Sequence, residues 1–253
     1  MGLPFTVEVI PGGDVASRLQ SHLAAPATVA VTCLPHHGPA KTVDLAVELA
    51  GLGYRAVPHL AARSVASKQQ LAEFMVRLAD AGVRDIFAVA GDAREPVGPY
   101  AWSLPLIEEI AATGGFETGF AAYPEGHPTV PEPELTELLL KKQELGSWAV
   151  TQMCFSGDVL SDYIARLRSS GVTVPIWAGV PGRVRRTRLI SLAGRIGVGP
   201  SLKFAKRSGS LLRSVLAPSS YDPSRLVRSI ETTGAFAGLH IYSFNDFRGL
   251  PRN

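Results

Sequence analysis

The sequence contains little of what marks an exported, membrane-bound or metal-binding protein. Only two cysteines, Cys33 and Cys154, occur in 253 residues, too few for a disulfide framework or the ligand spacing of a zinc site. No apolar run approaches the roughly 20 residues that cross a bilayer, and no cationic segment precedes an apolar run and a cleavage site. We therefore expect a cytoplasmic protein that does not enter a membrane.

The chain also lacks the charge and the glycine fingerprint of two common ligand-binding classes. Its net charge of +3 is small for this length and does not favour nucleic acid as a partner. We interpret the densest basic stretch, "RVRRTR" (183–188), as a solvated helix face; the alternative is a site for the polyanionic tail of a small ligand. The fingerprint G-x-G-x-x-G is met only in its first two glycines, by "GVGPSL" (197–202), which argues against an open doubly wound sheet, the alternative fold.

The chain consists largely of strand-like and helix-like apolar segments that alternate along the sequence. Apolar residues make up 46% of the chain, and stretches such as 68–82 and 133–146 carry them at helical spacing and end in glycine. The strand-like runs are continuously apolar, which is typical of a parallel sheet covered on both faces; they are "FTVEVI", "TVAVTCL", "YRAVPHL", "DIFAVAGD", "TGFAAYPE", "WAVTQMCF", "VPIWAGVPG" and "GLHIYSF". Strand and helix alternating eight times in about 250 residues predict a single-domain (β/α)8 TIM barrel over 1–253. An extra loop and helix around 197–221 is expected to cover the ligand.

Polar side chains recur where the predicted strands end. In such barrels the carboxyl ends of the strands surround the active site. Each residue alone has a structural explanation, such as a hydrogen-bonded glutamine or a histidine that holds a loop. Together, on six strands, they predict a site for a polar heterocycle, formed by Glu8, Thr32, His59, Asp92, Tyr123, Glu125, His127 and Gln152.

Glu8 is the most informative of these residues, because it lies between Val7 and Val9 in a strand expected to be buried. A carboxylate there costs several kcal/mol unless it is paired or protonated. A carboxyl group kept protonated near neutral pH can act as a general acid. The alternative is a structural glutamate paired with an arginine.

Seven segments resemble one family in their order and spacing: "FTVEVIPGG", "PHL", "AGD", "AAYPEGHP", "LLLKKQELG", "TQMCF" and "GLHIYSFN". This is the methylenetetrahydrofolate reductase family, and the resemblance covers essentially the whole chain as one catalytic barrel. It implies an oxidoreductase of one-carbon metabolism, linked to methionine biosynthesis. Such enzymes reduce the methylene bridge of methylenetetrahydrofolate to a methyl group, usually with FAD and a nicotinamide donor.

The resemblance also implies roles for single residues. Glu8 matches the acid that opens the five-membered ring to an iminium cation. Asp92 matches the aspartate that binds the pterin and offsets the positive charge of that cation. Gln152 matches the glutamine that hydrogen-bonds the pterin edge, and Tyr123 is expected in the wall where the donor ring and the pterin stack.

Further contacts are implied for the cofactor and the substrate tail. The loop "GPSLKF" (199–204) is expected to cover the folate, with Lys203 and Phe204 as candidates for tail binding and stacking; Phe204 could equally anchor a helix in the core. The residues expected to contact the cofactor are Thr32, His59, Tyr123, Glu125, His127 and Lys142.

The chain departs from the family pattern where the flavin binds. Cys33 and Leu34 replace an aromatic residue and a glycine, and Ala90 replaces an arginine that grips the flavin. In the helix after "YPEGHP", Leu135 stands where the family has an acidic residue, although Glu134 is adjacent. Each lost charge-assisted hydrogen bond costs about 1.5–3 kcal/mol, or about ten- to a hundredfold in affinity.

These departures predict an enzyme that works without FAD, in which NADH or NADPH passes its hydride directly to the folate carbon. A conventional FAD-dependent reductase and a non-catalytic folate-binding or one-carbon accessory protein are the alternatives. A different pterin carrier, a deazaflavin donor and a homo-oligomer stay open.

Overall fold

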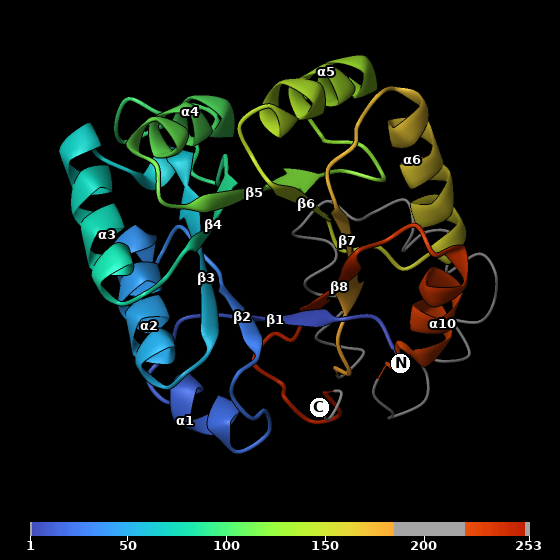
Figure 1. The fold of residues 1–253 in the computed structure, drawn as a ribbon, viewed down its shortest axis with the longest axis horizontal. Coiled ribbons are helices and arrows are strands. Elements are labelled where there is room, and N and C mark those ends of the chain that lie inside the picture. Colours follow the sequence, from blue (N-terminus) through green and yellow to red (C-terminus); the bar gives the residue numbers. More distant parts are fainter. Residues whose placement is uncertain (1, 185–220, 251–253) are drawn as a thin grey trace.

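A computed structural model describes residues 2–184 and 221–250 and shows a closed barrel of parallel strands in the order β1 to β8. Strand β1 pairs with both β2 and β8, which closes the sheet. The predicted (β/α)8 barrel is therefore confirmed, and the open sheet is excluded (Figure 1). The strands are β1 (Phe5–Val9), β2 (Thr28–Val31), β3 (Arg55–Ala61), β4 (Asp85–Val89), β5 (Glu117–Ala122), β6 (Trp148–Thr151), β7 (Ile176–Pro181) and β8 (Gly238–Tyr242).

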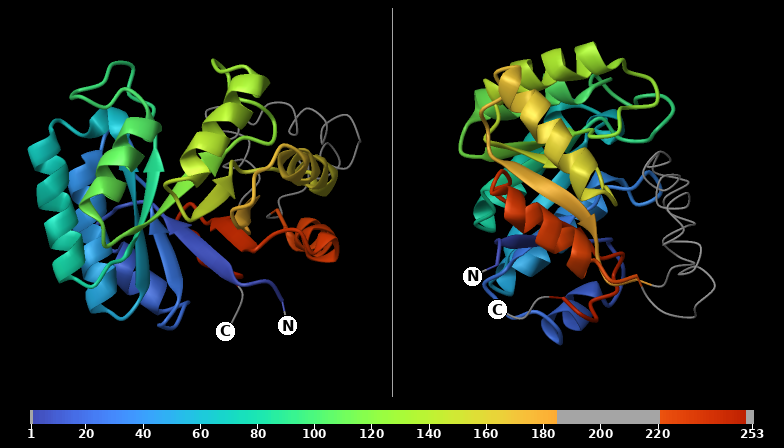
Figure 2. Two further views of the ribbon diagram at one scale, coloured as in Figure 1. Left: turned by 45° about the horizontal axis from the view of Figure 1, so that its top comes forward. Right: turned by 90° about the vertical axis from the view of Figure 1, so that its right-hand side faces the viewer.

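Helices surround the barrel on its outside (Figures 1 and 2). The helical spacing over 68–82 and 133–146 predicts two of them, α3 and α5, and both are confirmed. Ser67 caps α3 by accepting a hydrogen bond from the Gln70 amide, as a serine at a helix start commonly does. The helices are α1 (Val15–Gln20), α2 (Gly38–Gly51), the short 3-10 helix η1 (Ala62–Ser64), α3 (Lys68–Asp80), α4 (Ser103–Thr113), α5 (Glu132–Gln143), α6 (Gly157–Ser169) and α10 (Ser224–Thr233).

The alternation of side chains along each strand separates two apolar regions. Val7 and Val9 are fully buried in the large cluster that joins the strands to the helices. The residues of opposite parity face the barrel axis. A smaller cluster forms there, centred on Ala30, Val57, Phe87 and Val150. Glu8 lies in the same parity as these inward residues, so its carboxyl group points into the barrel.

Two tryptophans occupy the barrel interior near the amino ends of the strands, and glycines make room for both. A Cβ atom at Gly119 would lie 2.3 Å from the Trp148 indole, and one at Gly238 would lie 2.4 Å from that of Trp177. Real Cβ atoms do not approach other atoms so closely. These glycines are therefore required by packing rather than by backbone conformation.

Some expectations fall outside the described residues. They are most of the basic stretch 183–188, the extra loop and helix around 197–221, and both Lys203 and Phe204. Within the described ranges, no helix is long and apolar enough to cross a membrane.

Candidate active site

Glu8 is buried on the inner face of β1 and is held by histidine rather than arginine. Its Oε2 lies 3.0 Å from His240 Nε2, within hydrogen-bonding distance, and 4.0 Å from His59 Nε2. His240 comes from β8 and His59 from β3, so three strands bring these groups together. Among the described residues, the ion-pair partners of Glu8 are these two histidines, so the alternative of a structural Glu8–arginine pair is not observed.

The two histidines differ in their contacts, and burial shifts the pKa of His59. Burial is the main cause that lowers the pKa of His59 to about 4, with the neighbouring His240 lowering it further and Glu8 opposing the shift. His59 is therefore neutral near pH 7, and its Nε2 has no hydrogen-bond partner among the described residues. Only His240 is close enough to Glu8 to exchange a proton through a direct hydrogen bond.

The donor atoms of Glu8, His59 and His240 all lie within 4.8 Å of one another. Such a group can in principle hold a divalent metal ion. Here the Glu8 oxygen and the His240 nitrogen are already joined to each other, and an ion would have to break that bond. The arrangement therefore fits a proton-transfer pair better than a metal centre.

Tyr123 and His127 lie together after β5, as the sequence predicts. Their rings meet edge to face, with centroids 4.9 Å apart. Burial and the Asp92 carboxylate raise the pKa of the Tyr123 hydroxyl, whereas burial and then Lys142 lower that of the His127 imidazole. Asp92 itself is exposed in the loop after β4. The structure thus brings four predicted residues, from the loops after β4 and β5 and from α5, into one electrostatic neighbourhood.

Lys142 is the unusual member of this group, because its amine is buried in α5. Burial lowers its pKa from 10.5 to about 8. With this pKa the buried amine is still mostly protonated at pH 7, and a buried positive charge favours contact with an anionic ligand group.

Thr32 and Gln152 occupy the ends of β2 and β6. The Thr32 hydroxyl is buried and has no partner in the described part of the chain. The side-chain oxygen Oε1 of Gln152 accepts a hydrogen bond of 2.9 Å from the Met153 backbone N–H, which fixes the side-chain amide at the strand end. Glu125, in the turn after β5, is half-buried. Most of the predicted residues that the structure describes follow strand ends at one end of the barrel. Glu8 and His59 lie deeper, one and two residues before the ends of β1 and β3.

Sequence reasoning missed His240 and Tyr242, although both lie in the quoted segment "GLHIYSFN". They share inward parity with Thr6 and Glu8, to which β8 pairs them. The Tyr242 hydroxyl donates to the Thr151 carbonyl, 3.2 Å away. Alternation along 238–242, in which Leu239 and Ile241 face outward, could have indicated them.

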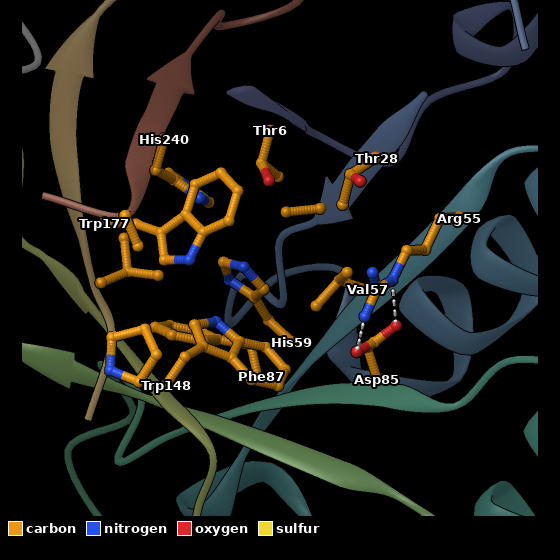
Figure 3. Close-up of a pocket in the computed structure, with 14 residues that line it drawn as sticks. Thr6, Thr28, Arg55, Val57, His59, Asp85, Phe87, Trp148, Trp177 and His240 are labelled. Atoms are coloured by element: carbon orange, nitrogen blue, oxygen red, sulfur yellow. Dashed lines mark hydrogen bonds and ion pairs between the residues drawn. The ribbon is translucent and has the colours of Figure 1, made fainter. Parts of the chain in front are cut away.

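A cavity of about 290 Å³ opens at the other end of the barrel, among the first residues of the strands. Figure 3 shows His59 near its centre, His240 and the two tryptophans on one side, and the Arg55–Asp85 pair on the other. The Arg55 guanidinium donates two hydrogen bonds of 2.6 Å to the buried Asp85 carboxylate. This cavity does not coincide with the predicted ligand site. The ligand site at the carboxyl end, where such barrels bind ligands, stays a prediction.

The closed parallel barrel defines the class of protein, the (β/α)8 barrels, and solved structures agree. An oxaloacetate acetylhydrolase in complex with 3,3-difluorooxalacetate superposes with a TM-score of 0.59 at 11% identity, covering 97% of this chain and 76% of that one. A putative lyase/mutase from Burkholderia cenocepacia J2315 gives 0.55 at 12% identity, with 98% and 79% covered. At such identities the likeness shows the fold alone.

The family is given by the sequence comparisons. Residues 14–182 match the model of the methylenetetrahydrofolate reductase family, and the chain belongs to this family. The 5,10-methylenetetrahydrofolate reductase of Pectobacterium carotovorum is 31% identical over 131 residues, which are 51% of this chain and 44% of the relative. Methylenetetrahydrofolate reductase 2 of Saccharomyces cerevisiae is 28% identical over 189 residues, 65% and 30% of the two chains.

A rice relative, named probable methylenetetrahydrofolate reductase (NADH), is 24% identical over 164 residues, 55% of this chain and 27% of the relative. The chain spans less than half the length of each of these three curated relatives.

Proposed function

We propose that this chain reduces 5,10-methylenetetrahydrofolate to 5-methyltetrahydrofolate with a hydride taken directly from NADH or NADPH. The observation that carries the proposal is the buried carboxyl group of Glu8, aimed into the barrel and hydrogen-bonded to His240. Membership in the reductase family supplies the reaction class. The name of the rice relative supports NADH as the donor.

Glu8 would act as the acid. Its carboxyl proton goes to N10 of the folate, and the bond between N10 and the methylene carbon breaks with its electron pair passing to N10. The methylene carbon becomes an N5-iminium cation, which accepts a hydride and becomes the methyl group. A positioned proton donor of this kind accelerates a reaction by about 10²–10⁴-fold.

Asp92 and Gln152 would hold the pterin during these steps. The Asp92 carboxylate would offset the positive charge of the iminium. The Gln152 amide is fixed at the end of β6 by its bond to Met153. The rings of Tyr123 and His127 would form the wall against which the donor and the pterin stack.

The residues after β2 and β4 do not fit the FAD that the family resemblance implies. Cys33 carries a thiol whose pKa is raised by burial, so it is neutral near pH 7. Ala90 has no side-chain donor, and the nearby Arg63 cannot replace the missing arginine. The Arg63 guanidinium already donates to the carbonyl groups of Ala93, Arg94 and Ala101, at 2.8, 2.6 and 3.3 Å.

An absorption spectrum of the purified protein, followed by addition of NADH and methylenetetrahydrofolate in the same cuvette, tests the proposal. We expect a colourless protein that oxidises NADH only after folate is added and without supplied FAD. A spectrum with flavin absorption that bleaches with NADH alone would instead support a conventional FAD-dependent reductase. Folate binding without any turnover would support a non-catalytic binding protein.

A further inference from the structure

The amino-end cavity reaches the two histidines beside Glu8 but not Glu8 itself. His59 and His240 both line it, together with the hydroxyl-bearing Thr6 and Thr28 (Figure 3). His240 therefore has one side on the cavity and its Nε2 on the Glu8 carboxyl group, 3.0 Å away. It is the one described side chain that both borders the cavity and hydrogen-bonds to Glu8.

The interior of a (β/α)8 barrel is normally filled by layers of side chains. Here about 290 Å³ is left open at the amino end, and a water molecule occupies about 30 Å³ of the liquid. Threonine hydroxyls, two imidazoles and the Arg55–Asp85 pair provide polar partners for several waters. The cavity has both the room and the polar groups that buried water requires.

The proposed reaction consumes one proton per turnover, because N10 gains a proton that Glu8 loses. Glu8 must be protonated again before the next turnover. At the carboxyl end of the barrel, the pterin and the nicotinamide would stand between Glu8 and solvent. A proton supply from the opposite end would leave the reacting rings undisturbed.

We propose that His240 returns the proton to Glu8 from the amino-end cavity, so that hydride and proton reach the reaction centre from opposite ends of the barrel. This inference rests on the proposed function. In the relay step the protonated His240 gives its Nε2 proton to the Glu8 carboxylate and becomes neutral. The neutral ring keeps its Nδ1 proton, so it turns about the Cβ–Cγ bond to bring Nε2 to the water of the cavity, takes a proton there and turns back. Glu8 and His240 are the two groups whose charge changes in this cycle.

The other groups that face Glu8 are less suited to this role. His59 lies 4.0 Å away, beyond hydrogen-bonding distance, and is neutral near pH 7. Tyr242 holds its proton strongly, since burial and the charge of Glu8 raise its pKa well above the usual value. The relay is therefore assigned to His240 alone.

Replacing His240 by glutamine separates the first turnover from later ones. In His240→Gln the side-chain amide can still donate a hydrogen bond to Glu8 but cannot relay a proton. After rapid mixing with folate and NADH, we expect a first equivalent of NADH to be oxidised at the rate of the unaltered protein. Steady-state turnover should then fall about ten- to a hundredfold, with a larger solvent deuterium isotope effect and little change in KM.

His240→Ala provides a second test, because imidazole added to the solution can enter the enlarged cavity. We expect millimolar imidazole to restore steady-state turnover at least fivefold in His240→Ala and to leave His240→Gln unchanged. His22→Ala is the matched control, since His22 is exposed and bonds only to its own helix turn; it should behave as the unaltered protein with or without imidazole.

Several results would overturn the relay. They are unaltered steady-state turnover in His240→Gln, loss of its first turnover together with the later ones, or a folded His240→Ala that imidazole does not restore. The second of these would mean that His240 only positions Glu8. If the unaltered protein itself never oxidises NADH with folate, the proposed function fails, and the relay fails with it.

Discussion

The two ends of the barrel differ in how their polar side chains are arranged and paired. At the carboxyl end, single polar residues that follow successive strands and one buried lysine form a loosely connected group, in which the buried Thr32 hydroxyl has no partner in the described chain. At the amino end, Arg55 and Asp85 form an ion pair near the tryptophans, although His59 Nε2 has no partner in the described chain. We propose that the carboxyl end receives the ligand and that the amino end supplies the proton. Glu8 and His240 connect the two.

The largest effect is expected at the point where the two ends meet. Glu8→Gln keeps the shape of the side chain and can still bond to His240, but it has no acidic proton. We expect NADH oxidation to fall at least about a hundredfold, with folate binding and the unfolding midpoint nearly unchanged. Steady-state kinetics and a folate titration check this, and turnover within a few fold of the unaltered protein would remove Glu8 from the mechanism.

At the carboxyl end, the buried amine of Lys142 should reduce stability at neutral pH. Its pKa is about 8 in the folded chain against 10.5 ordinarily, so between these values the unfolded chain binds more protons than the folded one. The free energy of unfolding should therefore rise as the pH increases from about 8 to 10.5, and below pH 8 the full penalty of burying the charge is present.

Lys142→Met removes this penalty, which is of the order of a few kcal/mol at pH 7. Urea unfolding at several pH values should show the variant more stable at pH 7 and the difference shrinking above pH 8. If Lys142 also contacts an anionic ligand group, the KM for NADH should rise in the same variant. A difference in stability that does not depend on pH would contradict the assigned pKa.

At the amino end, the close contact of Gly119 with Trp148 should make a single methyl group destabilising. Gly119→Ala places a Cβ atom 2.3 Å from the indole, and overpacking of this kind costs about 1–3 kcal/mol. Gly51→Ala is the control, since nothing lies within 4 Å of its Cβ position, and it should be neutral or stabilising. Equal stability of the two variants in urea unfolding would show that the tryptophan can move away.

The smallest effect is expected from the ion pair at the mouth of the cavity. Asp85→Asn leaves the amino end without the carboxylate that the Arg55 guanidinium binds. Because the Arg55 side chain is 65% exposed, solvent screens the pair, and we expect a loss of about 1 kcal/mol. The loss should shrink in 1 M salt, and a loss that salt does not change would indicate packing rather than charge.

The fold could be predicted from the sequence because the strands are continuous apolar runs and several helices are periodic and end in glycine. The carboxyl-end residues could be predicted because they follow those runs directly, as Tyr123 and His127 do. His240 could not be singled out in this way. Its importance depends on the closure of the barrel, which brings β8 beside β1 across more than 200 residues, and no local pattern reports that contact. The amino-end cavity likewise depends on the sizes of side chains from many strands.

The fate of the hydride tests the central claim most directly. NADH carrying deuterium at the transferred position of C4 would be supplied with methylenetetrahydrofolate, and the methyl group of the product would be examined by mass spectrometry. Direct transfer predicts one deuterium in each methyl group, with no dependence on added FAD. Loss of the label to water, with turnover that requires FAD, would show that a flavin carries the hydride and would contradict the account.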